Sequence, residues 1–258
     1  MNNLSLLESH FKLQKGMFFS EKDTFNSFEI FKSNVIEDFF WNYACVESNS
    51  ISQDLIAEME TVFEKLNRTP CIYLVGEQLS EKNLELLQKQ SYEETMVESW
   101  MVFNNDLSFE INYPVVRITD KKGFEDFKTV FVKAYGGEKT PEQPYGELPD
   151  TYIQCLENSF NHFDNFYHFV IYDNDLPISI ATLCYKDGIG GIYSVGTDPM
   201  YRGKGLGSTI TRACIRKWKE LGGNLLMLQT ETGSKVELLY SKLGFNKVFV
   251  GKGFVKSE

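Results

Sequence analysis

The sequence predicts an α/β (α+β) fold, in which a mixed, mostly antiparallel sheet is flanked by helices and the chain is divided into two lobes. Three observations predict it. The C-terminal half reads as a hairpin followed by strand, helix, strand, helix and strand, and the N-terminal half repeats the last five of these. Residues 1–113 hold 8 Lys+Arg against 19 Asp+Glu, whereas residues 114–258 hold 18 against 17. We therefore predict two domains, residues 1–113 and residues 114–258.

Composition and charge limit the classes of function. Hydrophobic residues make up 42% of the chain and charged residues 24%, which suffices for a proper core and is far from a disordered composition. The net charge of -10 and the pI near 5.0 argue against nucleic acid or an anionic membrane as a partner, because both bind basic surfaces. We therefore expect neither partner.

Compartment and metal binding can also be predicted. Glu8, His10 and Lys12 interrupt the N-terminal stretch that a signal peptide would keep apolar, and no apolar run approaches the length of a membrane span. This predicts a cytoplasmic protein. The five cysteines are an odd number without a C-x-x-C pair, which favours reduced, buried thiols over a disulfide framework or a zinc site. We expect no metal.

Periodicity and turn residues place the elements of the C-terminal half. Apolar residues at helical spacing indicate helices, β-rich runs indicate strands, and Gly222-Gly223 and Gly244 end two of the helices. In chain order we expect helices at Gly123–Tyr135 and Pro149–Phe160, a hairpin at Phe166–Tyr185, a strand at Ile189–Thr197, a helix from Leu206 to Leu221, a strand at Leu225–Gln229, a helix at Val236–Leu243 and a strand at Phe245–Val250.

One glycine-rich segment carries most of the functional information. It reads YSVGTDPMYRGKGLGS from Tyr193 to Ser208, between a predicted strand and a predicted helix. Its glycines let the backbone approach a ligand closely, and the following helix N-terminus adds partial positive charge. Arg202 and Lys204 add full charges. The segment therefore predicts a site for a phosphate or diphosphate.

The spacing within this segment excludes two common nucleotide motifs. A Walker P-loop needs Ser or Thr directly after its Lys, whereas Gly205 follows Lys204. A dinucleotide fingerprint needs its third glycine one residue later than Gly207. A site for ATP or another nucleotide is therefore disfavoured.

The segment does fit the pattern R-x-x-G-x-G, with Arg202, Gly205 and Gly207 at the fixed positions. Downstream, LLMLQTETGSKVELLYSKLGF places Tyr240 shortly before Leu243-Gly244-Phe245. These two motifs, in this order and spacing, resemble the GNAT superfamily of acyl-CoA-dependent N-acyltransferases. The resemblance covers the C-terminal domain and is most specific from Ile192 to Phe245.

The resemblance implies an N-acetyltransferase (an acyltransferase) that moves an acetyl group from acetyl-CoA, its cosubstrate, to a primary amine by direct attack. The family's tyrosine that protonates the departing thiolate maps to Tyr240, and Gly233 stands where many members carry Asn. The family's strand bulge, whose amides bind the pantetheine arm and the acyl carbonyl, maps to Val195, Gly196 and Thr197. The loop that binds the CoA diphosphate maps to Arg202, Gly203, Lys204, Gly205, Leu206, Gly207 and Ser208.

Several alternatives stay open. Glu231, just past a buried strand, is a candidate general base, and deprotonation through water is the other. The same loop would serve a non-catalytic acyl-CoA-binding sensor or regulatory module, although Tyr240 favours the enzyme. The resemblance allows a small-molecule or peptide amine as the acceptor, such as a polyamine, an aminoglycoside, an amino acid, a peptide N-terminus or a lysine, and the sequence does not select among them. The oligomeric state has no signal in the sequence.

The N-terminal half resembles a degenerate GNAT-like copy. LLQKQSY aligns with LYSKLGF, but ESNSISQ stands in place of the phosphate loop, without glycine or a basic residue, and Leu87 replaces the tyrosine. We therefore expect this lobe to be structural and not to bind CoA. We also expect it to shape the acceptor side of the site, where its carboxylates favour a cationic amine. Its predicted elements are a strand at Phe39–Cys45, a helix at Asp54–Leu66, a strand at Cys71–Val75, a helix at Glu81–Gln90 and a strand at Met96–Phe103.

Overall fold

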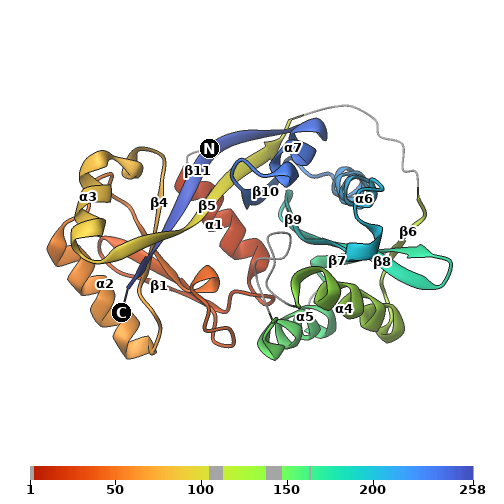
Figure 1. Cartoon of the computed structure of the whole chain (residues 1–258), viewed down its shortest axis with the longest axis horizontal. Helices are drawn as coiled ribbons and strands as arrows, with labels where there is room; N and C mark the ends of the chain where they lie inside the picture. The colour runs from red at the N-terminus through yellow and green to blue at the C-terminus, as the bar shows by residue number, and fades with distance from the viewer. Residues whose placement is uncertain (1–2, 105–112, 138–146, 163, 258) are drawn as a thin grey trace. The chain divides into compact units, whose positions relative to one another are not determined.

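The computed structural model describes residues 3–104, 113–137, 147–162 and 164–257 (Figure 1). The chain forms two compact units, and the segments near the C-terminus belong alternately to one unit and the other. Unit 1 comprises Met1–Met101, Gln229–Leu238 and Lys247–Glu258, and unit 2 comprises Val102–Leu228 and Leu239–Asn246. The domains predicted from the sequence, 1–113 and 114–258, are each continuous. That these two stretches are related domains stays a proposal. The compact units have different boundaries, because segments of the two units alternate along the chain.

Unit 1 is built on a mixed sheet in which the strand order is β1-β2-β3-β4-β11-β5. Strands β3 and β4 are parallel, and β11 runs antiparallel to β4 from Gly251 opposite Val75 to Val255 opposite Cys71. The last strand of the chain therefore completes the sheet of unit 1. Its elements, some of them shared with unit 2, are α1 (Asn3–Gln14), β1 (Glu21–Thr24), β2 (Phe28–Lys32), η1 (Phe39–Trp41), β3 (Tyr43–Val46), α2 (Gln53–Leu66), β4 (Cys71–Val75), η2 (Gly76–Leu79), α3 (Glu81–Lys89), β5 (Tyr92–Phe103) and β11 (Phe245–Lys256).

The core of unit 1 joins residues that lie far apart in the sequence. Helix α2 buries Ile56, Met59 and Phe63 against this sheet. Leu87 of α3 and Phe254 of β11 belong to the same cluster. Burial of large apolar side chains at this density supplies most of the driving force for folding, so α2, α3 and β11 are held by one shared core.

Unit 2 contains the strands β10-β9-β8-β7-β6 in that order, with β9 and β10 parallel and the others antiparallel. Figure 1 shows α4 and α5 on one side of β7–β9 and α6 on the other. This is a three-layer arrangement in which both faces of the strands are covered. Its elements, again with some shared, are β6 (Val115–Arg117), α4 (Lys121–Tyr135), α5 (Asp150–His162), β7 (Phe166–Asp173), β8 (Leu176–Lys186), β9 (Ile189–Thr197), η3 (Pro199–Tyr201), α6 (Leu206–Glu220), β10 (Leu225–Glu231) and α7 (Lys235–Lys242).

The predicted elements of both halves are largely confirmed, with differences that have local causes. The strand expected at 39–45 was wrong in its first part, because Asp38 accepts a hydrogen bond from the Phe40 N–H and starts the 3₁₀ turn η1. Only Tyr43–Val46 is a strand there. Strand β11 continues to Lys256 instead of ending at residue 250, since its second half pairs with β4.

Candidate active site

Strand β9 carries a bulge at Ser194 and Val195, which shares only Val195 with the positions predicted from the sequence. Gly196 lies opposite Ile180 and Tyr193 lies opposite Thr182, so Ser194 and Val195 together face one residue of β8. Ser194 adopts a left-handed conformation with φ 52°. The bulge frees the backbone of these residues from the regular ladder, so that its polar groups can point elsewhere.

Two hydrogen bonds fix the direction of the peptide groups beyond the bulge. The Tyr135 hydroxyl donates to the Val195 carbonyl (2.8 Å), and the Ser179 hydroxyl donates to the Gly196 carbonyl (2.9 Å). In a trans peptide the N–H points opposite to the C=O. The Gly196 N–H is therefore turned away from α4, and the Thr197 N–H is turned away from β8. These are donors of the kind that stabilise a developing oxyanion.

The N-terminus of α6 provides a set of backbone donors. Gly205 is its N-cap with φ 78° and without a side-chain cap, and the first helical bond runs from Thr209 N–H to the Gly205 carbonyl. The N–H groups of the three residues between them, Leu206, Gly207 and Ser208, precede the first intrahelical donor and therefore lack helical acceptors. A Cβ at Gly203 or Gly205 would meet nothing within 4 Å, so the turn is open to a ligand. Open amides at a helix N-terminus suit a diphosphate.

The two basic residues of the loop have different environments. Lys204 lies over the ring of Tyr201, with its ammonium 4.6 Å from the ring centroid. Arg202 donates from Nε to the Thr197 carbonyl (3.3 Å) and from a terminal nitrogen to the Ala134 carbonyl (3.2 Å). Arg202 and Lys204 are both exposed to solvent. The Arg202 guanidinium thus joins β9 to the last turn of α4.

An ion pair strengthens the same junction. Lys133 of α4 lies 2.8 Å from the Asp198 carboxylate, which also accepts from the Met200 N–H and starts η3. Burial alone would raise the pKa of Asp198, but the Lys133 and Met200 hydrogen bonds and the charges of Lys133 and Arg202 leave this pKa below its ordinary value. No signal in the sequence indicated the residues Lys133 and Tyr135, because their roles depend on how α4 packs.

Tyr240 is a buried residue of unit 2. It is 6% exposed, and its ring packs edge-to-face on Phe245 with centroids 6.0 Å apart. Burial raises the pKa of its hydroxyl, and the nearby Cys214 thiol adds to the rise. The neighbouring Leu239 approaches α6, since a Cβ at Gly207 would lie 3.8 Å from its Cδ1. The structure therefore brings α7 and the α6 N-terminus together within unit 2.

Glu231 is placed differently from the other predicted residues. It is exposed at the end of β10 and belongs to unit 1, whereas the bulge, the loop and Tyr240 belong to unit 2. Nearby, Glu237 accepts a hydrogen bond from the Gly233 N–H, while the Ser234 hydroxyl accepts from the Glu237 N–H. This capping pattern starts α7 and occupies the Gly233 amide, where many of the resembled proteins carry Asn.

The corresponding place in the N-terminal half is filled by side chains of the protein. Gln78 accepts from the Val75 N–H of β4 and donates to the carbonyls of Val46, the last residue of β3, and Ser48, just beyond it. The side chain of Asn83 donates to the Asn49 carbonyl and accepts from the Ile51 N–H. Both side chains are almost completely buried. The ends of the parallel strands β3 and β4 are thereby tied together.

The helix that follows in this half also lacks a free N-terminus. Ser52 is the N-cap of α2, and its hydroxyl accepts from the Leu55 N–H (3.2 Å). In α6 the equivalent residue is Gly205, which has no side chain to act as a cap. Leu87, at the position aligned with the predicted catalytic tyrosine, is fully buried in the core. That this half does not bind CoA stays a prediction.

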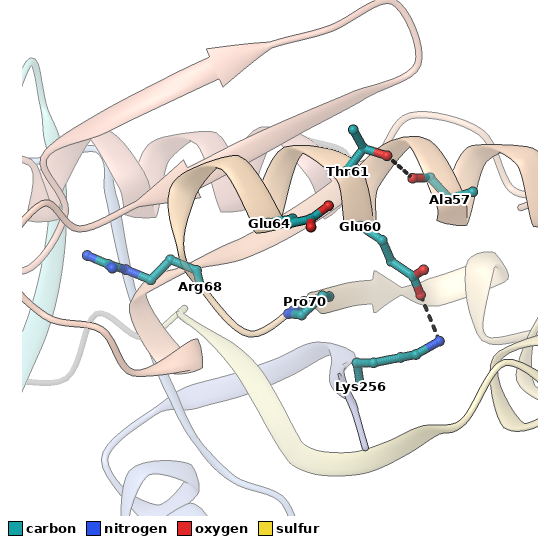
Figure 2. A pocket seen from close by; sticks show the side chains of 7 residues that line it. All are labelled: Ala57, Glu60, Thr61, Glu64, Arg68, Pro70 and Lys256. Atoms are coloured by element: carbon teal, nitrogen blue, oxygen red, sulfur yellow. Dashed lines mark hydrogen bonds and ion pairs between the residues drawn. The ribbon is translucent and has the colours of Figure 1, made fainter. Parts of the chain in front are cut away.

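A shallow pocket of about 420 Å³ lies on unit 1 and contains none of the predicted site residues (Figure 2). Its opposing charges are already paired, because Lys256 lies 2.9 Å from Glu60. Figure 2 shows Arg68 pointing away from the other lining side chains. We therefore assign it no role. It is lined by Ala57, Glu60, Thr61, Glu64, Arg68, Pro70 and Lys256.

Within the described ranges, no three side chains of His, Cys, Asp or Glu gather as they would around a metal ion. Every helix in the part of the chain that the structure describes is too short or too polar to cross a bilayer.

Comparison with known proteins gives one match to a family model. A family model described as an acetyltransferase (GNAT) domain matches residues 164–247. No curated protein matches the sequence.

Solved structures resemble nearly the whole chain. A GCN5-related N-acetyltransferase from Kribbella flavida is 14% identical, with a TM-score of 0.69, over 98% of this chain and 95% of its own. A GCN5-related N-acetyltransferase from Sphaerobacter thermophilus is 14% identical, with a TM-score of 0.64, over 96% of this chain and 84% of its own. A tandem GNAT protein from the clavulanic acid biosynthesis pathway is 10% identical, with a TM-score of 0.57, over 88% of this chain and 77% of its own. Residues 164–247 therefore match a GNAT acetyltransferase domain, and nearly the whole chain shares the fold of solved GNAT proteins, among them a tandem GNAT protein.

Proposed function

We propose that the protein transfers an acetyl group from acetyl-CoA to the primary amine of a small molecule or peptide. One observation carries the proposal: the uncapped, glycine-lined N-terminus of α6 directly follows the bulged end of β9, in a domain that matches acetyltransferases. The residues fit the cosubstrate, because open amides and Lys204 suit its diphosphate, and the Gly196 and Thr197 amides suit its thioester arm.

Acetyl transfer requires three contributions from the protein: stabilisation of the oxyanion, protonation of the thiolate and removal of a proton from the amine. The Gly196 and Thr197 N–H groups stabilise the oxyanion that forms when a neutral amine attacks the thioester carbonyl. Tyr240 holds a proton for the departing thiolate. Its raised pKa keeps it protonated at neutral pH, and the same burial raises the proton affinity of a thiolate beside it. Glu231, or water, takes the proton that the amine loses.

The charge of the N-terminal half indicates which kind of acceptor it would attract. Residues 1–113 carry 19 Asp+Glu against 8 Lys+Arg, which attracts cations over the distance of a Debye length. We therefore propose that the acceptor is cationic, and that the N-terminal half has a structural role without CoA binding.

An acceptor screen tests this function. The protein is incubated with acetyl-CoA and a panel of polyamines, aminoglycosides, amino acids and peptides, and free thiol is measured. Amine-dependent thiol release, with the acetylated amine found by mass spectrometry, is the expected result. Calorimetric binding of acetyl-CoA without thiol release on any amine would instead indicate a sensor or regulatory module.

A further inference from the structure

Three consecutive residues at the end of α4 hold the end of β9, and we call Lys133, Ala134 and Tyr135 the α4 clamp. The Tyr135 hydroxyl binds the Val195 carbonyl, Lys133 binds Asp198, and the Ala134 carbonyl accepts from Arg202. The clamp therefore contacts the bulge and the start of the loop from one side.

We propose that Tyr135 and Arg202 are positioning residues that fix the Val195–Gly196 peptide and the end of β9 for acetyl transfer. In this assignment the Arg202 guanidinium does not bind the diphosphate. The inference rests on the proposed function, because it concerns the same site.

The close packing of α4 on the bulge supports the role of Tyr135. A Cβ at Gly196 would lie 2.8 Å from the Ala134 Cβ and 3.2 Å from the Tyr135 ring, so only glycine lets α4 approach this far. The Tyr135 hydroxyl then fixes the Val195 carbonyl at 2.8 Å. Because the N–H of the same peptide points the opposite way, this one hydroxyl sets the direction of the Gly196 donor. A donor aimed before the reaction stabilises an oxyanion more than one that must reorient.

The partners of Arg202 support its role. Its guanidinium serves two backbone carbonyls, one at the end of β9 and one in the last turn of α4. The Ala134 carbonyl lies at a helix C-terminus, where a cation is favourable and where carbonyls lack helical partners. Turning Arg202 toward a phosphate would leave both carbonyls without this donor. The amides of the α6 N-terminus and Lys204 need no such rearrangement.

A donor lacking the diphosphate separates positioning from phosphate binding. Acetyl transfer to an amine found in the screen is measured with acetyl-CoA and with S-acetylpantetheine, which keeps the thioester arm. For Tyr135→Phe and Arg202→Gln we expect kcat to fall about tenfold with both donors, while KM for acetyl-CoA changes by less than about threefold. Arg202→Lys should behave like Arg202→Gln, because an ammonium cannot replace the planar fork that bridges two carbonyls.

Opposite results overturn each assignment. An unchanged kcat for Tyr135→Phe removes its positioning role. If Arg202→Gln is impaired only with acetyl-CoA, and Arg202→Lys restores the activity, Arg202 binds the diphosphate after all. A wild-type protein that acetylates no amine sinks the proposed function and this inference with it, whereas an active wild type with an equally active Tyr135→Phe variant sinks only the inference.

Tyr172→Phe is the matched control. The Tyr172 hydroxyl also binds α4, at Asp126 (3.0 Å), but it does not touch the bulge. Its removal should leave kcat with both donors unchanged. Thermal unfolding of every variant shows whether the chain is folded, and if Arg202→Gln fails to fold, the Tyr135→Phe and Tyr172→Phe pair still decides the central point.

Discussion

Tyr240 has the environment that a proton donor to a thiolate needs. It is buried, its pKa is raised by that burial, and it lies on the turn of α7 next to the residue that approaches the α6 N-terminus. A phenol in ordinary solvent would also be protonated at neutral pH, so in the proposed mechanism burial would act mainly by raising the proton affinity of the thiolate.

We predict that Tyr240→Phe lowers kcat about a hundredfold and leaves the affinity for acetyl-CoA nearly unchanged, since the lost hydroxyl acts on the leaving group. Steady-state kinetics and calorimetry measure the two effects. Tyr185→Phe is the control, because its hydroxyl only donates to the Leu221 carbonyl. Equal turnover of the Tyr240→Phe variant and the wild type would remove Tyr240 from the mechanism.

Two buried histidines make the fold sensitive to acid. His10 packs against Phe19 and Trp100 in unit 1, and His168 is surrounded by aromatic rings in unit 2, with Nδ1 2.9 Å from the Thr182 hydroxyl. Burial lowers the pKa of each to about 3 from the ordinary 6.5. Both are therefore neutral in the folded chain and become protonated on unfolding at mildly acidic pH.

Acid lowers the stability of the folded chain through these two histidines. Below pH 6.5 the unfolded chain binds more protons than the folded chain, so stability falls as the pH decreases toward 3. Between pH 6 and pH 5, we expect the free energy of unfolding to fall by up to about 1.4 kcal/mol per pH unit for each histidine. Urea unfolding at several pH values measures this, and His168→Gln should remove about half of the slope. A flat profile across this range would contradict the burial of neutral histidines.

At the scale of elements, the two halves differ most at one helix N-terminus. Ser52 caps α2, and Gln78 ties together the strand ends beside it, whereas Gly205 leaves α6 uncapped after a bulged strand. The same strand–helix–strand pattern thus gives a capped helix N-terminus in one half and an uncapped one in the other. The difference rests on a few side chains and not on the fold.

We predict that Gly205→Val raises the dissociation constant for acetyl-CoA at least about tenfold, because a side chain enters the open turn and strains its φ of 78°. Gly222→Val is the matched control at the other end of α6. Its φ is 73° and its Cβ also meets nothing within 4 Å, so it should cost similar stability without affecting binding. Equal calorimetric affinities for the two variants would show that the turn does not hold the cosubstrate.

Much of this local structure could be predicted from the sequence. Strands at Cys71–Val75 and Ile189–Thr197 and the start of α6 at Leu206 are confirmed, because alternation, turn residues and glycines are local signals. The strands β1 and β2 were missed. β1 is a short charged strand without an apolar face, and its pairing with β2 gives it a place in the sheet.

The contacts of the site could not be predicted in the same way. The sequence places Arg202 beside glycines and so indicates a phosphate ligand, whereas its side chain reaches the Ala134 carbonyl, 68 residues earlier in the chain. Tyr135 reaches Val195 across a similar separation. Such partners depend on how α4 packs against β9, which no local pattern encodes.

At the scale of the whole molecule, the two compact units share the end of the chain. Strand β11 follows α7 in sequence but pairs with β4, and Phe254 lies in the core of unit 1. The sequence predicted this strand only as far as residue 250 and did not predict its partner, because a strand can pair with any free sheet edge of suitable register. A fragment of residues 1–113 would therefore lack a strand of its own sheet, which makes the intact chain the proper subject for binding experiments.

We predict that Phe254→Ala lowers the free energy of unfolding by about 3 kcal/mol, since it leaves a cavity in a core whose other members come from the N-terminal half. Val248→Ala, on the same strand but 50% exposed, should cost less than about 0.5 kcal/mol. Urea unfolding of the full chain compares them. Similar stabilities of the two variants would contradict the pairing of β11 with β4.

We expect the α6 N-terminus to bind the diphosphate of acetyl-CoA and the β9 bulge to bind its thioester arm. A crystal structure of the full chain with CoA would show both contacts. We predict diphosphate oxygens within hydrogen-bonding distance of the Leu206, Gly207 and Ser208 amides, with the pantetheine arm along Val195–Thr197. A diphosphate bound elsewhere, for example at the capped N-terminus of α2, would contradict the account.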